Sequence, residues 1–172
     1  MKKVIVSVII LLSIVVTASR GSTQFNSEII DSVKLTEDDL PEGFMYGKIP
    51  EPYKKTLKDN PWLMDRPAIK RLAGMVYPGG DYNRITGMHV SIIADKKTPY
   101  GDDIVCYVIL YSGMKAAEAE IKKISEFTWF NRDRAILLTK ENLAVIMFVD
   151  DVNNFHLIQE LARSMEDRFK NI

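Results

Sequence analysis

The stretch that most constrains the fold runs from residue 103 to residue 149. It opens with Ile104–Tyr111, in which β-branched and aromatic side chains predominate, and this composition predicts a strand. Residues 114–130 repeat apolar side chains at spacings of three and four, which predicts a helix with one apolar face. Two further apolar segments, 135–140 and 143–149, predict a tight hairpin, in whose turn we expect Asn142 to adopt the left-handed conformation.

The elements on either side extend this stretch into a regular order. Residues 85–94 and 104–111 form a predicted first hairpin, and an amphipathic helix over 155–169 follows the second. A short strand is predicted over 44–49. We therefore predict an α+β fold: an antiparallel sheet of about five or six strands in ββα-ββα order, with both long helices on one face.

The strand 104–111 is apolar on both of its faces. A strand that meets water on one side alternates apolar with polar residues, so we expect both faces of the sheet to be covered. The long helices would cover one face. The segment 53–72, a ligand or a second copy of the chain would cover the other, and a homodimer through a sheet face is therefore one prediction.

The first residues have the pattern of a secretory signal peptide. Lys2 and Lys3 precede an apolar run from Val4 to Ala18, whose last residue is small, as a cleavage point requires. The run is shorter than the roughly 20 residues that span a bilayer, so we favour cleavage, with a retained N-terminal membrane anchor as the alternative. The predicted parts are a signal peptide over 1–18, a polar tether over 19–34 and a single α+β domain over 35–172.

The cysteine content and the charge balance indicate in which cellular compartment the protein works and which partners it lacks. Cys106 is the only cysteine, so no disulfide can form within the chain. Small secreted domains of eukaryotes rely on disulfides, and the sequence has no Asn-x-Ser/Thr sequon. We therefore expect an exported bacterial protein, located in the periplasm or outside the cell. The 23 basic and 23 acidic side chains balance, which argues against a nucleic-acid partner.

His89 and Ser91 are the most distinctive polar pair in a predicted strand. They share one face of the strand 85–94, opposite an apolar row. If odd positions pair with odd positions in the first hairpin, they join Tyr107 and Tyr111 on the face away from the long helices. A slip of one residue would separate them. These four residues form a candidate ligand-binding patch, with a partly exposed edge of satisfied polar groups as the alternative.

Three arginines precede the two ββα units. Arg84 comes before the first unit, and Arg132 and Arg134 come before the second. Guanidinium groups bind anions through paired hydrogen bonds, so these residues form a candidate anion-binding cluster. Asp81 and Asp133 are equally placed to neutralise them, and ion pairing is the interpretation we favour.

The sequence offers little support for catalytic or metal chemistry. A free cysteine inside an apolar strand, as Cys106 is, behaves as a small hydrophobe, and one cysteine with two distant histidines falls short of a zinc pattern. We expect no catalytic residue, no metal and no cofactor. The leading hypothesis is an exported, non-catalytic module that binds a protein or a small ligand. The alternatives are a small hydrolase or transferase that uses His89 and Ser91, and a membrane-tethered accessory subunit.

Overall fold

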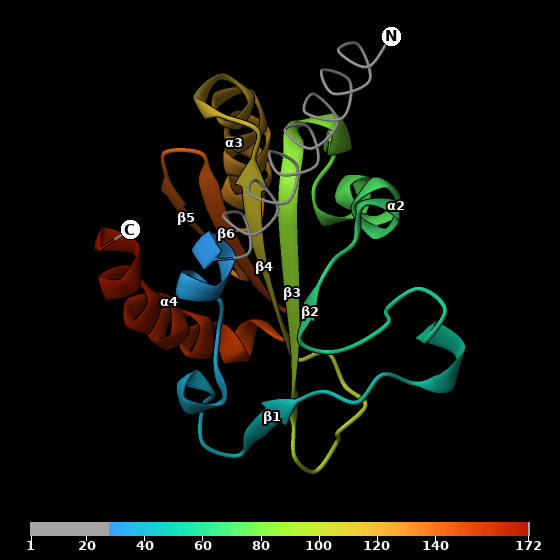
Figure 1. Ribbon diagram of the computed structural model, residues 1–172. Coiled ribbons are helices and arrows are strands. Elements are labelled where there is room, and N and C mark those ends of the chain that lie inside the picture. The colour runs from blue at the N-terminus through green and yellow to red at the C-terminus, as the bar shows by residue number, and fades with distance from the viewer. Residues whose placement is uncertain (1–27, 172) are drawn as a thin grey trace, which may run out of the picture.

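The computed structural model describes residues 28–171, and an antiparallel sheet of six strands forms its centre (Figure 1). The strands are β1 (Phe44–Tyr46), β2 (Trp62–Leu63), β3 (Ile85–Asp95), β4 (Ile104–Tyr111), β5 (Ala135–Lys140) and β6 (Leu143–Val149). The helices are α2 (Arg66–Val76), α3 (Met114–Phe130) and α4 (Phe155–Lys170), preceded by a helical segment over 28–33. Short 3-10 turns lie at Glu37–Asp39, Glu51–Tyr53, Tyr82–Arg84 and Val152–Asn154. The predicted α+β class and the number of strands are confirmed.

The strands lie side by side in the order β1-β3-β4-β6-β5, and β2 also pairs with β3. The hairpins β3–β4 and β5–β6 are each followed by a long helix, so the ββα-ββα order is confirmed. Because β4 is antiparallel to β6, and β6 is antiparallel to β5, strands β4 and β5 run in the same direction. Helix α3 is therefore the crossover between two parallel strands.

The long helices α3 and α4 lie on opposite faces of the sheet, and the prediction that they share one face is wrong. Cys106 and Val108 of β4 belong to the core that α4 covers. Ile109, on the other face of β4, belongs to the core that α3 and α2 cover. Crossovers between parallel strands are right-handed, which confines α3 to one face. The apolar side chains of the opposite face then remain for α4 to cover.

Residues 28–34 belong to the packed domain. Ile30 and Val33 are wholly buried in the core under α4, where Leu35 joins them. Gly87 on β3 permits this approach, because a Cβ there would stand 2.6 Å from Ile30 Cδ1. The predicted tether over 19–34 is therefore wrong for residues 28–34. Its residues 19–27 and the predicted signal peptide over 1–18 lie outside the described residues.

Helix α2 supplies the cover that the segment 53–72 was expected to give. The Asp65 carboxylate accepts a hydrogen bond of 2.9 Å from the Ala68 N–H and caps the helix, and Pro67 occupies its first turn. Ile69 and Leu72 then pack into the core on the α3 face. Both faces of the sheet are thus covered by described elements. The predicted homodimer through a sheet face required an uncovered face, and residues 28–171 leave none.

The β5–β6 turn differs from the prediction in one residue. Glu141, and not Asn142, has the left-handed conformation, with φ of 50°. Asn142 instead ties the turn to β4: its side-chain amide donates to the Tyr111 carbonyl at 2.8 Å, and its carbonyl accepts from the Tyr111 N–H at 2.8 Å. These two bonds hold the turn beside the end of β4.

Candidate functional site

The register of the β3–β4 hairpin separates the four residues of the predicted patch. His89 pairs with Val108 and Ser91 pairs with Cys106, so odd positions face even positions. His89 and Ser91 therefore lie on the face under α4 and the 28–33 helix, whereas Tyr107 and Tyr111 lie on the α3 face. His89 is 3% exposed and Ser91 is 1% exposed. The four residues form no common patch.

The His89–Ser91 pair lacks the geometry of an acid–base site. His89 Nδ1 and Ser91 Oγ are both buried without a hydrogen-bond partner in the described chain, so neither bonds the other. Burial lowers the pKa of His89 to about 4, with a smaller contribution from the Lys34 charge, and the ring is neutral at pH 7. Burial raises the pKa of Cys106 to about 12, which keeps this thiol protonated.

The three arginines do not converge. Arg132 follows the C-terminal end of α3 and lies 5.2 Å from the Trp129 ring centre, and Arg134 is 3.7 Å from Asp133. Arg84 lies near Glu120 in the N-terminal half of α3 and lines a hollow at the start of this helix. Arg132 and Arg134 follow the C-terminal end of the same 17-residue helix, so most of its length separates them from Arg84. Its Nε lies 3.4 Å from Asp81 Oδ2, so the favoured interpretation, ion pairing, is confirmed for Arg84 and Arg134.

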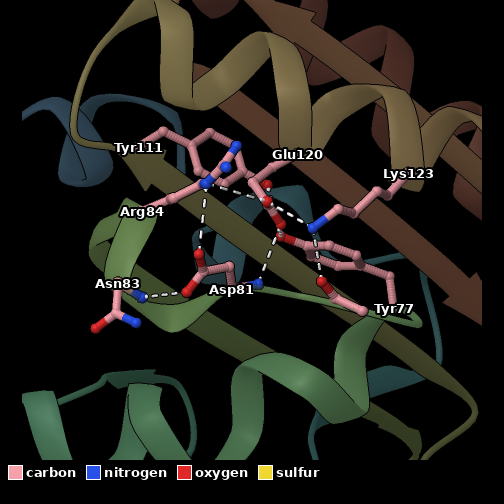
Figure 2. A network of polar contacts seen from close by, with 8 residues as sticks. Tyr77, Asp81, Asn83, Arg84, Tyr111, Glu120 and Lys123 are labelled. Carbon is pink, nitrogen blue, oxygen red and sulfur yellow. Dashed lines mark hydrogen bonds and ion pairs between the residues drawn. The ribbon is translucent and has the colours of Figure 1, made fainter.

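A buried carboxylate that the sequence analysis missed organises the surroundings of Arg84. The side chain of Glu120 on α3 is wholly buried. It accepts hydrogen bonds from Tyr77 Oη at 2.9 Å, from the Asp81 N–H at 3.1 Å and from Lys123 Nζ at 2.7 Å (Figure 2). Its Oε1 also lies 3.7 Å from Arg84 Nε. One carboxylate thus joins α3 to the loop 77–84.

Two tyrosines form the inner side of this network. The hydroxyl groups of Tyr77 and Tyr111 lie 3.2 Å apart, and Tyr77 donates onward to Glu120 (Figure 2). Burial raises the pKa of both hydroxyls, and the nearby Glu120 charge raises them further. Both side chains are therefore protonated over the whole physiological range. They act as hydrogen-bond donors and not as bases.

The loop 77–84 is shaped by its glycines and by Asp81. Gly80 lies so close to α2 that a Cβ there would be 2.6 Å from the Ala73 carbonyl oxygen. The Asp81 carboxylate accepts a hydrogen bond of 2.9 Å from the Asn83 N–H, which lowers its pKa, and the Arg84 charge adds to this effect. Lys123 donates to the Gly79 carbonyl at 2.7 Å. The loop is held from both sides, and Arg84 is held with it.

A hollow of about 830 Å³ opens beside Arg84 at the start of α3. Its lining consists of Arg84, Ser112, Gly113, Met114, Lys115, Ala116, Glu118, Ala119 and Lys122. The first turn of α3 contains no acidic residue and has no side-chain cap. The two ion pairs of Arg84 are made through Nε, and no hydrogen bond joins its terminal amino groups to a residue within 28–171. The hollow therefore presents positive groups.

A second hollow, of about 390 Å³, lies between the loop 47–61 and the turn 98–102. The Asn60 side chain fixes this loop to β3, because its amide donates to the Ile92 carbonyl at 2.7 Å and its oxygen accepts from the Ile92 N–H at 2.8 Å. Tyr53 and Tyr100 line the hollow and are 60% and 63% exposed. Lys48 is the one cation and Asp102 the one carboxylate among its lining residues, so the charges of this hollow balance, in contrast to those of the hollow at Arg84.

The signal for Glu120 was present in the sequence. Ala117 and Ile124 belong to the apolar face of the helix, and Glu120 falls between them at the same helical spacing. An acidic residue on an apolar face requires a polar partner in the core. Those partners, Tyr77 and the loop 77–84, come from a distant part of the chain.

Residues 28–171 contain neither a candidate metal site nor a candidate membrane-spanning helix. No group of three or more His, Cys, Asp or Glu side chains in this part of the chain could hold a metal ion. None of its helices is long and apolar enough to cross a membrane. Comparison with protein-family models, with curated proteins and with solved structures finds no match to this chain. A function must therefore be argued from the site itself.

Proposed function

We propose that this chain is an exported, non-catalytic binding module that takes a small anionic ligand in the hollow beside Arg84. The ligand class is a compound with an exposed carboxylate or phosphate group. Both groups match the planar donor pattern of a guanidinium.

The fixed position of Arg84 carries this proposal. Asp81 and Glu120 both lie near its Nε, at 3.4 Å and 3.7 Å, so the edge of the guanidinium that carries Nε faces the protein. The two terminal amino groups remain for a ligand. An arginine that is held in place loses less conformational entropy when it binds an anion than an unrestrained one does.

The remaining charges of the hollow favour an anion. Lys115 and Lys122 line it and form no ion pair with any described residue. Glu118 is the one carboxylate among the lining residues. With Arg84, the lining has three cations and one anion. Asp81 and Glu120 offset part of the Arg84 charge, so Lys115 and Lys122 supply most of the excess positive charge. Such a site suits a ligand of one or two negative charges, with millimolar affinity, or about −4 kcal/mol.

The chemistry of the network supports a binding role over a catalytic one. Glu120 accepts three hydrogen bonds and has no access to solvent, so it cannot exchange a proton with a ligand in the hollow. Tyr77 and Tyr111 stay protonated because burial raises their pKa. The one carboxylate that lines the hollow, Glu118, is exposed, and no described residue holds it in a position for proton transfer.

An NMR titration with inorganic phosphate tests the anion site. We expect the amide signals of residues 112–116 to shift with a dissociation constant of roughly 1 mM, and Arg84→Gln to weaken binding at least about tenfold. The shift should also decrease as sodium chloride is raised, because the site is exposed to solvent. A parallel titration with acetate tests the carboxylate class.

Arg132→Gln is the matched control, because Arg132 is exposed and lies on the Trp129 ring away from the hollow. It should leave phosphate binding unchanged. If Arg84→Gln and Arg132→Gln weaken binding equally, or if no amide in 112–116 responds to about 20 mM phosphate, the proposal is wrong. Export is tested separately: the mass of the chain recovered outside the cytoplasm should correspond to cleavage near Ala18.

A further inference from the structure

Strand β5 is the outer strand on one side of the sheet. It pairs with β6 alone, and no described strand adjoins its other side (Figure 1). At the opposite side, two short strands, β1 and β2, and the loop between them cover β3. The two edges therefore differ, and only β5 offers a continuous strand edge of six residues.

The pairing with β6 determines which backbone groups of β5 point outward. The Val149 N–H donates to the Arg134 carbonyl at 2.9 Å, and the register then gives Ile136 and Leu138 the ladder bonds to β6. The N–H and C=O groups of Leu137 and Thr139 point away from the sheet. No described residue bonds them. They form a template of two donors and two acceptors for another strand.

Most of the edge lacks the features that usually prevent strand addition. Residues 135–139, Ala-Ile-Leu-Leu-Thr, contain no proline and no charged side chain, and the β5–β6 register has no bulge. Lys140, the last residue of the strand, is its one charged residue. Natural edge strands are usually protected by such features. The apolar part of this edge is therefore open to the addition of another strand.

A hollow of about 400 Å³ lies beside this edge on the α4 face. Leu138 and Phe169 supply its apolar surface. Thr139 and Lys140 of β5 and Glu166 and Lys170 of α4 also line it. Because Leu138 is only half-buried, a neighbouring strand could cover it with an apolar side chain.

We propose that the β5 edge binds the β5 edge of a second copy of this chain, antiparallel and about a two-fold axis. Leu137 of each copy pairs with Thr139 of the other, and the two Leu138 side chains meet at the axis between the two hollows. Four backbone hydrogen bonds form, and the six strands of each copy join into one continuous sheet.

The charges beside the edge are self-complementary, which favours a second copy over an unrelated peptide. Glu166 and Lys170 are four residues apart on α4 and line the same hollow, so a two-fold axis reverses their order and brings Glu166 of one copy toward Lys170 of the other. Lys170 already lies 3.2 Å from Asp167 and is 69% exposed, so its ammonium group can also reach a neighbour. The formal net charge is zero for the full chain, and it is −2 when Lys2 and Lys3 are removed with the predicted signal peptide, so repulsion between copies is small.

Analytical ultracentrifugation of the purified full chain tests the dimer. A short edge of this kind predicts a dissociation constant of roughly 10–100 μM. Thr139→Pro removes an outward N–H without removing a ladder bond to β6, and it should weaken association at least about tenfold. Thr139→Val keeps the N–H and is the matched control, which should associate like the parent chain.

A charge exchange on α4 tests the two-fold arrangement without altering the strand. Glu166→Lys and Lys170→Glu should each weaken self-association, because like charges then meet twice across the axis. An equimolar mixture of the two variants should recover the parent affinity, since both contacts are then between opposite charges. This arm remains informative if Thr139→Pro fails to fold.

Three results would overturn the proposal. The first is a chain that stays monomeric at about 1 mM. The second is a dimer that Thr139→Pro leaves unchanged, which would place the interface elsewhere. The third is a mixture of the charge variants that associates no better than either variant alone.

Discussion

Removal of the Glu120 carboxylate should destabilise the domain more than any other single change to an acidic residue of α3. In Glu120→Ala, the Tyr77 hydroxyl and the Asp81 N–H lose their acceptor inside the protein. Each stranded polar group costs about 1–3 kcal/mol. Lys123 is 38% exposed on its side chain and Arg84 is 41% exposed, so both can return to water at little cost.

The two stranded groups together give an expected loss in the free energy of unfolding of about 2–6 kcal/mol. For a domain of this size, a loss in the middle of this range, about 4 kcal/mol, should lower the melting temperature by roughly 8–16 °C. Glu120→Gln should cost less, about 1–2 kcal/mol, because its amide oxygen can still accept from Tyr77. Urea unfolding followed by circular dichroism measures both values.

Glu126→Ala is the matched control. Glu126 lies on the same helix, is exposed and forms no hydrogen bond or ion pair with a residue within 28–171, so its replacement should change stability by less than about 0.5 kcal/mol. A double-mutant cycle of Glu120→Ala with Tyr77→Phe should give a coupling energy of about 1–2 kcal/mol. If Glu120→Ala falls within about 1 kcal/mol of Glu126→Ala, our account of the buried network is refuted.

Three further predictions concern His89, Cys106 and two glycines. The pKa of His89 is about 4 in the native state and 6.5 in the unfolded chain, so between these pH values the unfolded state binds a proton that the native state does not. The free energy of unfolding is therefore highest above pH 6.5 and decreases by about 3 kcal/mol as the pH falls to 4. Urea titrations of His89→Leu should lack this decrease, and a variant with the same pH profile as the parent chain would contradict the prediction. Cys106, wholly buried with its pKa raised to about 12, should not react with a thiol reagent at pH 8 until urea unfolds the chain, and rapid reaction of the native protein would show that the core is open. Gly80→Ala should destabilise the domain by about 2 kcal/mol or more in a thermal melt, because its Cβ would approach the Ala73 carbonyl oxygen. Gly74→Ala on α2 is the control: a Cβ there meets nothing within 4 Å, so this variant should be neutral or stabilising in the same measurement.

The candidate site was only partly accessible to sequence reasoning. Arg84 and its ion pair with Asp81 were predicted, because a separation of three residues makes the contact local. Glu120 was not, since its partners Tyr77 and the Asp81 N–H lie about 40 residues away. The patch of His89 with Tyr107 failed for a related reason: a shift of one residue in the hairpin register moves a side chain to the opposite face.

The sequence by itself determined the element order, the antiparallel class of the sheet and the presence of cover on both of its faces. These properties follow from local patterns: the apolar character of Ile104–Tyr111 on both faces, and the helical repeat of α3 and α4. Only the tertiary structure decided which helix covers which face. That choice depends on the insertion of β6 between β4 and β5, which makes α3 a crossover between parallel strands and sends α4 to the other side. Strand order arises from contacts between distant segments, and no local pattern in the chain records it.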